Sequence, residues 1–222
     1  MLWEGLPMNE WSPPELPPHI PLVGTHVRLE PLCEAHLPGL AAVLARRETF
    51  AGGWGGGTAA ATTDPEEFAV LVRRTSMAQQ RPYAVLLADG RVVGTSTLGE
   101  FEPARERLHL GWTAYAPQAW GTVVNPETKL LLLRHVFDHG WGRVRLQTDV
   151  LNRRSRAAIS KLGARFEGIT RRDQRRADGT WRDAAVHAIT IDDWPQVRVG
   201  LEQRVRDWQP DLSLWADIPP TP

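Results

Sequence analysis

The residues between Pro117 and Asn125 have the composition of an anion-binding loop that leads into a helix. Turn-forming residues gather between Pro117 and Gly121. Asn125 is a favoured cap, Pro126 a favoured first helical residue, and Glu127 complements the positive end of the helix dipole. We therefore expect a helix from Pro126. Unpaired N–H groups at such a terminus favour negative charge, so the loop is a candidate phosphate site.

His109 is the side chain before this loop that is best suited to proton transfer, because histidine titrates near neutral pH. It stands between Leu108 and Leu110. The alternative interpretation is therefore a single polar residue on a half-exposed strand. Glu100 and Glu102, near the end of the preceding strand, are alternative carboxylates for the same role.

Three other kinds of site have partial signals that we do not favour. His135 and His139 have metal-ligand spacing, but no third ligand accompanies them, so we expect no metal. The glycines of 52–57 lack the Lys-Ser/Thr ending of a nucleotide loop. We interpret them as a mobile loop that presents Trp54 as an apolar surface. No Gly-x-Ser-x-Gly run supports a serine hydrolase.

Composition narrows the possible partners and compartments. The chain has 222 residues, of which 42% are hydrophobic, enough for one sizeable core. Lys+Arg and Asp+Glu both number 26, which argues against general nucleic-acid binding. The segment 143–176 is locally basic, with ten arginines and one lysine against three acids, as suits either a solvated face or a partner that is anionic. A single cysteine, no signal-like start and no long apolar run predict a cytoplasmic protein without internal disulfide or membrane contact.

Hydrophobic periodicity and turn signals predict an α+β (mixed α/β) fold rather than a doubly wound dinucleotide fold. Four consecutive leucines at 130–133 make the central helix apolar on most sides, and Gly140 is its natural stop. In chain order we expect a strand at 25–32, helices at 34–46 and 64–78, strands at 82–87, 92–98 and 108–115, the central helix, a strand at 144–150, a helix at 152–163, strands at 166–172 and 181–191, and a helix ending near 205.

Both ends of the chain differ from the segment between them. Residues 1–22 hold six prolines and predict an extended arm, residues 23–206 form the expected domain, and residues 207–222 form a Trp- and Pro-containing tail. Disordered tails are usually poor in aromatic residues. Trp3, Trp11, Trp208 and Trp215 therefore predict that the ends dock on the domain or on a second subunit, which favours a homodimer.

Two stretches together resemble the GNAT superfamily of N-acetyltransferases. Gln118, Gly121 and Val123 occupy the spacing of its pyrophosphate loop, although Val stands where Gly or Ala is usual. The later run from Asn152 through Ser155 to Gly163 is similar to the family's fourth helix. The resemblance covers residues 23–205 and is closest to the Rim-type branch, which is similar to ribosomal-protein N-terminal acetyltransferases.

The resemblance implies a site for acetyl-CoA between the strands at 108–115 and 144–150. Backbone at Trp112, Thr113 and Ala114 would contact pantetheine, and Asn152 would contact the cofactor region. Ser155 would lie near the thioester sulfur, Trp54 would close over the substrate, and His109 takes the place of the usual glutamate base. The phosphate loop would bind through Gln118, Trp120, Gly121, Thr122, Val123, Val124 and Asn125.

The resulting hypothesis is an N-acyltransferase that moves an acetyl group from acetyl-CoA to a primary amine by direct attack in a ternary complex. The acceptor is open between a protein N-terminus and a small-molecule amine. Two alternatives remain: a catalytically silent CoA-binding or protein-interaction module of the same fold, and an acyltransferase with another donor such as succinyl-CoA.

Overall fold

The computed structural model describes residues 12–78, 81–209 and 211–220. Eight strands of this described part form one sheet in the order β1-β2-β3-β4-β5-β6-β8-β7. All neighbours are antiparallel except β5 and β6, which are parallel. The strands are β1 Leu22–Val23, β2 Val27–Pro31, β3 Arg81–Leu87, β4 Val92–Glu102, β5 Arg107–Tyr115, β6 Arg143–Asp149, β7 Arg165–Arg175 and β8 Trp181–Thr190.

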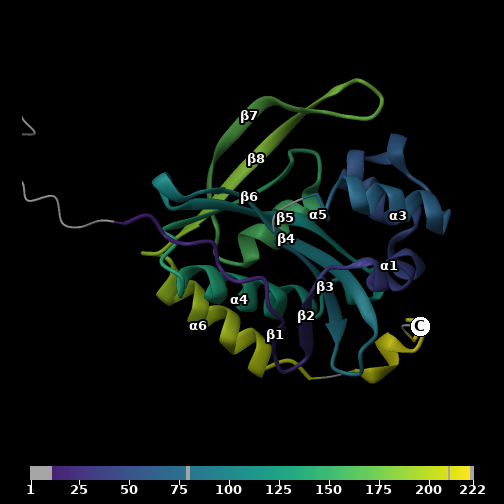
Figure 1. Ribbon diagram of the computed structural model, residues 1–222, viewed down its shortest axis with the longest axis horizontal. Coiled ribbons are helices and arrows are strands. Elements are labelled where there is room, and N and C mark those ends of the chain that lie inside the picture. The colour runs from purple at the N-terminus through teal and green to yellow at the C-terminus, as the bar shows by residue number, and fades with distance from the viewer. Residues whose placement is uncertain (1–11, 79–80, 210, 221–222) are drawn as a thin grey trace, which may run out of the picture.

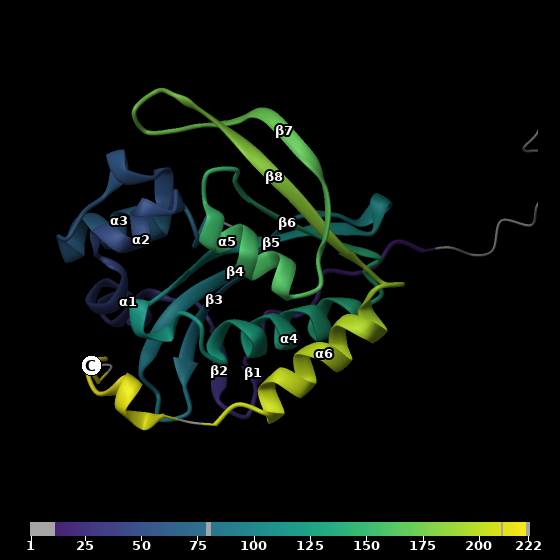
Figure 2. The ribbon, with the colours of Figure 1, turned by 180° about the vertical axis from the view of Figure 1, so that it is seen from behind.

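Helices cover the sheet, and the predicted mixed α/β class is confirmed. Helices α4 and α6 lie side by side along one face, and α1 to α3 gather near one end. The β7–β8 hairpin extends beyond the rest of the sheet, with its tip on the same side of the molecule as α3 (Figures 1 and 2). The helices are α1 Leu37–Leu44, α2 Arg47–Ala51, α3 Pro65–Arg74, α4 Val124–Phe137, α5 Arg153–Lys161 and α6 Trp194–Arg206. Short 3-10 turns include η2 Trp54–Gly56, η3 Thr58–Ala60, η5 Pro117–Ala119 and η6 Leu212–Trp215.

Most predicted elements lie within a few residues of the observed ones. Asp64 caps α3 by accepting from the Glu67 N–H, as its acidic, proline-containing start predicts. The short elements β1 and α2 were not predicted, since two and five residues are too few for a periodic signal. The prediction of a helix covered on most sides is confirmed, because α4 buries Leu130, Leu132 and Leu133.

The start of α4 differs from the prediction. The helix begins at Val124 with Val123 as its cap, so Asn125 is already inside the first turn and does not cap it. The Thr122 hydroxyl accepts from the Val124 N–H at 3.3 Å, which supplies a side-chain acceptor nearer the start than Asn125. Pro126 still lies in the first turn, where its missing N–H has no helical partner to lose.

Both described chain ends pack on the domain. Pro17 is buried in the N-terminal segment, and the Trp141 indole donates to the Glu15 carbonyl at 3.0 Å. At the C-terminal end Trp215 is buried, and Arg91 donates to the Ile218 carbonyl at 3.2 Å. The predicted docking of the tail is thus confirmed for Trp215. Trp3 and Trp11 lie outside the described residues.

Glu127 ties α4 to the first hairpin. Its buried carboxylate accepts the backbone N–H groups of Thr25, His26 and Val27, the last two at 2.8 and 3.0 Å. Charged acceptors strengthen such bonds, so this single side chain satisfies three donors of the β1–β2 turn. The role is structural, in addition to the dipole role expected from sequence.

We predict that Glu127→Gln lowers the free energy of unfolding by about 2–4 kcal/mol, because an amide turns its NH₂ toward N–H donors that the carboxylate had satisfied. Urea denaturation measures the change. Glu66→Gln, on the exposed first turn of α3, is the matched control and should change stability by less than about 1 kcal/mol. Equal, small effects of both variants would contradict the role of Glu127.

Candidate active site

A cleft of about 700 Å³ opens where β5 and β6 separate. The two strands pair only through 107–109 and 143–145. Beyond these residues β5 and β6 form opposite walls, the first turns of α4 form the floor, and α5 and η2 add further surface. Most of the residues predicted for the site line this cleft: Trp54, His109, Trp112, Thr113, Ala114, Trp120, Gly121, Thr122, Asn125, Asn152 and Ser155.

Three residues predicted for the phosphate loop do not line the cleft. Val123 and Val124 are buried in the core, and Gln118 lies in the η5 turn beside it. The contacts predicted for the two valines are those of their backbone amides, and side-chain burial does not test these contacts. The side chains themselves point into the core. The reason is local geometry: η5 turns the chain before the helix begins, so the valines face inward.

The phosphate loop uses some of its amides internally. The N–H groups of Trp120, Thr122 and Val124 already bond to Pro117, Ala119 and Thr122. Within the described part of the chain, the N–H groups of Gly121, Val123 and Asn125 have no protein acceptor. These three amides are thus available to an anion.

The unusual Val123 fits this loop without strain. Its φ and ψ are −68° and −18°, ordinary helical values, whereas Gly121 has the positive φ of 77° that the turn requires. The left-handed residue of the loop is therefore Gly121. Position 123 therefore does not require the positive φ that a valine would resist.

An aromatic and a guanidinium group border the loop. The Trp120 indole donates to the Tyr115 carbonyl at 2.9 Å, which fixes the ring. The Arg154 guanidinium carbon lies 3.4 Å from the ring centroid, a cation–π contact, and both side chains line the cleft. Arg154 belongs to the basic segment 143–176, so part of that segment faces the anion-binding end of the cleft.

A β-bulge shapes the middle of the cleft. The β4–β5 register shifts between Thr95 and Thr97, and Trp112 opposite has φ of 50°, rare for a bulky residue. The Trp54 indole donates to the Trp112 carbonyl at 3.2 Å and its ring stacks on Phe68. Trp54 is thus both packed and placed at the cleft, and its role over a substrate stays a prediction.

His109 is a lining residue of the cleft whose ring is almost enclosed by protein. The residue is only 7% exposed, and Nδ1 lies 3.2 Å from Glu100 Oε1. Arg145 pairs with the other oxygen of Glu100. Among the described residues Nε2 has no hydrogen-bond partner. A Cβ on Gly111 would lie 2.6 Å from Nε2, so only glycine leaves room for the ring here.

The Glu100 carboxylate is the anionic partner in this group. The hydrogen bond from His109 and the charges of His109 and Arg145 lower the pKa of Glu100, against the effect of burial. Because Nδ1 faces Glu100, Nε2 is the ring nitrogen left for a substrate. Glu102, the other candidate carboxylate, pairs with Arg105 and Arg107 and does not line the cleft.

Asn152 and Ser155 start α5 at the cleft wall. Asn152 Oδ1 accepts from the Ser155 N–H at 3.0 Å, the predicted cap, and Nδ2 donates to the Gly52 carbonyl at 2.6 Å. Asn152 therefore also ties α5 to the glycine-rich segment. Ser155 lines the cleft with Trp112 and Ala114, as its predicted role requires.

Lys129 lies in the cleft floor and was missed from sequence. It is 4% exposed, and its ammonium donates to Ser96 Oγ at 2.8 Å and Thr113 Oγ1 at 2.6 Å. Burial lowers the pKa of Lys129 to about 7. A lone lysine among the buried residues of an apolar helix, four residues after Asn125, was the available signal.

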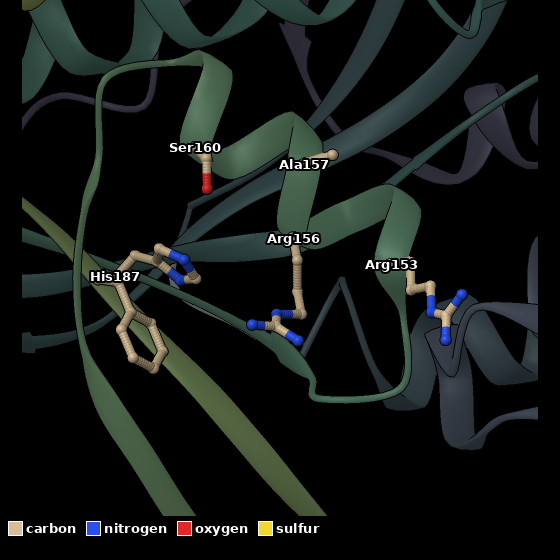
Figure 3. A pocket seen from close by; sticks show the side chains of 6 residues that line it. Arg153, Arg156, Ala157, Ser160 and His187 are labelled. Atoms are coloured by element: carbon tan, nitrogen blue, oxygen red, sulfur yellow. The ribbon is translucent and has the colours of Figure 1, made fainter.

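A second depression, of about 420 Å³, lies between α5 and the β7–β8 hairpin (Figure 3). Arg153, Arg156 and Ser160 face it from α5, and His187 lies on β8. Burial lowers the pKa of His187, and nearby Arg156 adds to this shift. Apart from Ala157, which borders both hollows, none of its lining residues faces the main cleft.

Two further observations concern sites considered from sequence. His135 Nε2 bonds to the Pro18 carbonyl and His139 Nδ1 to the His135 carbonyl. In the described ranges, no cluster of three potential metal ligands occurs, and no helix is both long and apolar enough to span a membrane.

Comparisons with known proteins agree with this geometry. Residues 26–165 match the family described as "Acetyltransferase (GNAT) domain". A protein from T. thermophilus described as an acetyltransferase is 31% identical, with TM-score 0.74, covering 88% of this chain and 99% of that one. A GCN5-related N-acetyltransferase from Brucella melitensis is 27% identical, with TM-score 0.77 and coverage of 87% and 89%. No curated protein sequence matches.

This chain therefore belongs to the GNAT family, and it is an acyl-CoA-dependent N-acetyltransferase. Among structures that share the fold is Mycobacterium smegmatis RimJ in complex with CoA-disulfide, at 22% identity and TM-score 0.65, covering 85% of this chain and 95% of that one. Ribosomal-protein-S5-alanine acetyltransferase from Vibrio fischeri has the same fold at 15% identity, with TM-score 0.59 and coverage of 79% and 98%. At these identities the two neighbours show the shared fold.

We predict that Lys129→Met makes the protein more stable near pH 7 and changes the pH dependence of stability. A lowered pKa means that the unfolded chain binds a proton more readily between pH 7 and about 10, so the wild type gains stability as pH rises through that window. The difference in free energy of unfolding between the wild type and Lys129→Met should change by on the order of 1 kcal/mol per pH unit.

Urea denaturation of both proteins from pH 6 to pH 9.5 measures this difference. Ser96 and Thr113 remain paired in the variant because their hydroxyls lie 2.9 Å apart. Lys161→Met, which removes an exposed ammonium, should follow the wild type. Parallel curves for wild type and Lys129→Met would show that Lys129 titrates normally.

Proposed function

We propose that this enzyme transfers the acetyl group of acetyl-CoA to a primary amine by direct attack in a ternary complex. The observation that carries the proposal is His109 Nε2, which is buried beside the open edges of β5 and β6 without a partner among the described residues. A buried nitrogen left unpaired costs free energy. A substrate amine whose proton it accepts would satisfy it.

The donor fits the cleft from the loop to the bulge. The free amides of Gly121 and Val123, with Arg154 nearby, favour the pyrophosphate. The unpaired edges of β5 and β6 offer N–H and C=O groups to the amides of pantetheine. The thioester then lies near Trp112, and Ser155 on the opposite wall can donate to the departing sulfur.

The acceptor amine enters beside Glu100 and the η2 turn. It attacks the thioester carbonyl, and His109 Nε2 accepts the proton that the nitrogen loses. Glu100, bonded to Nδ1, stabilises the imidazolium that forms. The C–S bond then breaks, the amide forms and CoA leaves as the thiol once its sulfur is protonated.

The acceptor class and the assembly belong to the same proposal. We propose a primary amine, either a protein N-terminus or a small molecule, because the lining of the cleft carries both charges, with Asp149 and Asp173 as well as Arg145 and Arg182. The cytoplasmic location and a homodimer through the terminal segments stay predictions.

Isothermal titration calorimetry with acetyl-CoA and CoA, followed by turnover assays on protein N-terminal peptides and small amines, tests the proposal. We expect His109→Gln to lower kcat by about 10²–10³-fold, because the general base is lost, and to change the Kd for acetyl-CoA by less than about twofold. His139→Gln is the control, because His139 is exposed and lies two residues beyond the end of α4.

Four outcomes would contradict the proposal. Wild-type protein that binds neither ligand at millimolar concentration has no donor site. Binding without turnover of any amine would favour the silent module, and full activity of His109→Gln would remove the assigned base. Faster turnover with succinyl-CoA than with acetyl-CoA would identify succinyl-CoA as the better donor and contradict the proposed acetyl transfer.

A further inference from the structure

Lys129 reaches from the floor of the cleft to the bulge between two strands. Its ammonium donates to Ser96 on β4 and Thr113 on β5, which lie within the register shift. The side chain lines the cleft although almost none of it reaches bulk water. It is therefore an ionisable group in contact with the space that a donor would fill.

The surroundings of Lys129 do not compensate its charge. In the described part of the chain, no carboxylate lies within ion-pair distance of Nζ, and both partners are neutral hydroxyls. Burying an unpaired ammonium costs free energy, whereas a methionine of similar length would fill the same space without that cost. Ser96 and Thr113 do not need the lysine, because their hydroxyls bond to one another. Stability therefore gives no reason for a lysine here.

The number of N–H donors on Lys129 indicates that one hydrogen-bond partner is missing. An ammonium has three N–H donors. Two are used on Ser96 and Thr113, and the third has no acceptor among the described residues. The open side of Lys129 is the cleft.

We propose that Lys129 is a ligand-binding residue whose protonated side chain donates its third hydrogen to an oxygen of the acyl donor in the cleft. This inference rests on the proposed function, because it requires the donor to lie between β5 and β6. Lys129 is one helical turn beyond Asn125, away from the phosphate loop. Its acceptor is thus on the pantetheine or acyl part of the donor rather than on the pyrophosphate.

The proposal makes donor binding depend on pH. Only the protonated side chain has a third hydrogen to give, so binding takes up a proton and weakens as pH rises above neutrality. Charged groups on the neighbouring elements are engaged with other partners: Glu127 of α4 with the β1–β2 turn, and Glu100 of β4 with His109 of β5 and Arg145 of β6. The charged residues that α5 and α6 contribute to the lining of the cleft are all cationic: Arg154, Lys161 and Arg204.

The test compares Kd values for CoA, acetyl-CoA and succinyl-CoA at pH 6.0 and pH 8.5 by calorimetry. At pH 6.0 we expect Lys129→Met and Lys129→Gln to bind at least one ligand about ten- to a hundredfold more weakly than the wild type, because a hydrogen bond from a charged donor is lost. At pH 8.5 the difference should shrink by at least fivefold. Lys161→Met removes an exposed cation from the same cleft and should keep the wild-type pH dependence.

The three ligands identify the oxygen. Equal losses for CoA and acetyl-CoA place it on pantetheine, a loss for acetyl-CoA but not CoA places it on the acyl carbonyl, and the largest loss for succinyl-CoA places it on the acyl carboxylate. Equal Kd values and equal pH dependence of wild type and both Lys129 variants, with the wild type still binding, would overturn the inference. Failure of the wild type to bind any ligand would instead overturn the proposed function.

Discussion

The early end of the pairing between β5 and β6 is the constraint on which the site depends. Three residue pairs hold the strands together, and then their edges separate inside the sheet. Unpaired backbone groups within a protein need partners, and water or a ligand must supply them. A donor with amides along its length satisfies such edges as a strand would. The separation therefore provides both the space and the binding groups of the cleft.

Several contacts keep the walls of the cleft in place. Trp54 bonds to the carbonyl of the strained Trp112, and Asn152 ties the start of α5 to Gly52. From below, α4 is anchored to the first hairpin by Glu127. Such preorganisation matters for acyl transfer, because donors aimed at developing charge act best when they do not have to move. Residues far apart in sequence thus fix one geometry.

The order of elements could be predicted from sequence because caps, prolines and apolar periods are local signals. Asp64 and Asn152 do cap their helices, as their spacing indicates. Asn125 does not cap α4, because the Thr122 hydroxyl accepts from the Val124 N–H nearer the start of the helix. The sequence alone does not show which of the two side chains takes this role. The partners of His109 were predictable only in part. Glu100 was a candidate, but the pairing with Arg145 depends on strand register, and the burial of Lys129 depends on the bulge beneath which it lies.

The most direct test of this account is a crystal structure of the protein with CoA bound. We predict pantetheine between β5 and β6, the pyrophosphate at the N–H groups of Gly121 and Val123, and the thiol between Trp112 and Ser155. The account would be contradicted by CoA bound in the depression between α5 and the β7–β8 hairpin. It would also be contradicted by β5 and β6 paired along their whole length, with the cleft closed.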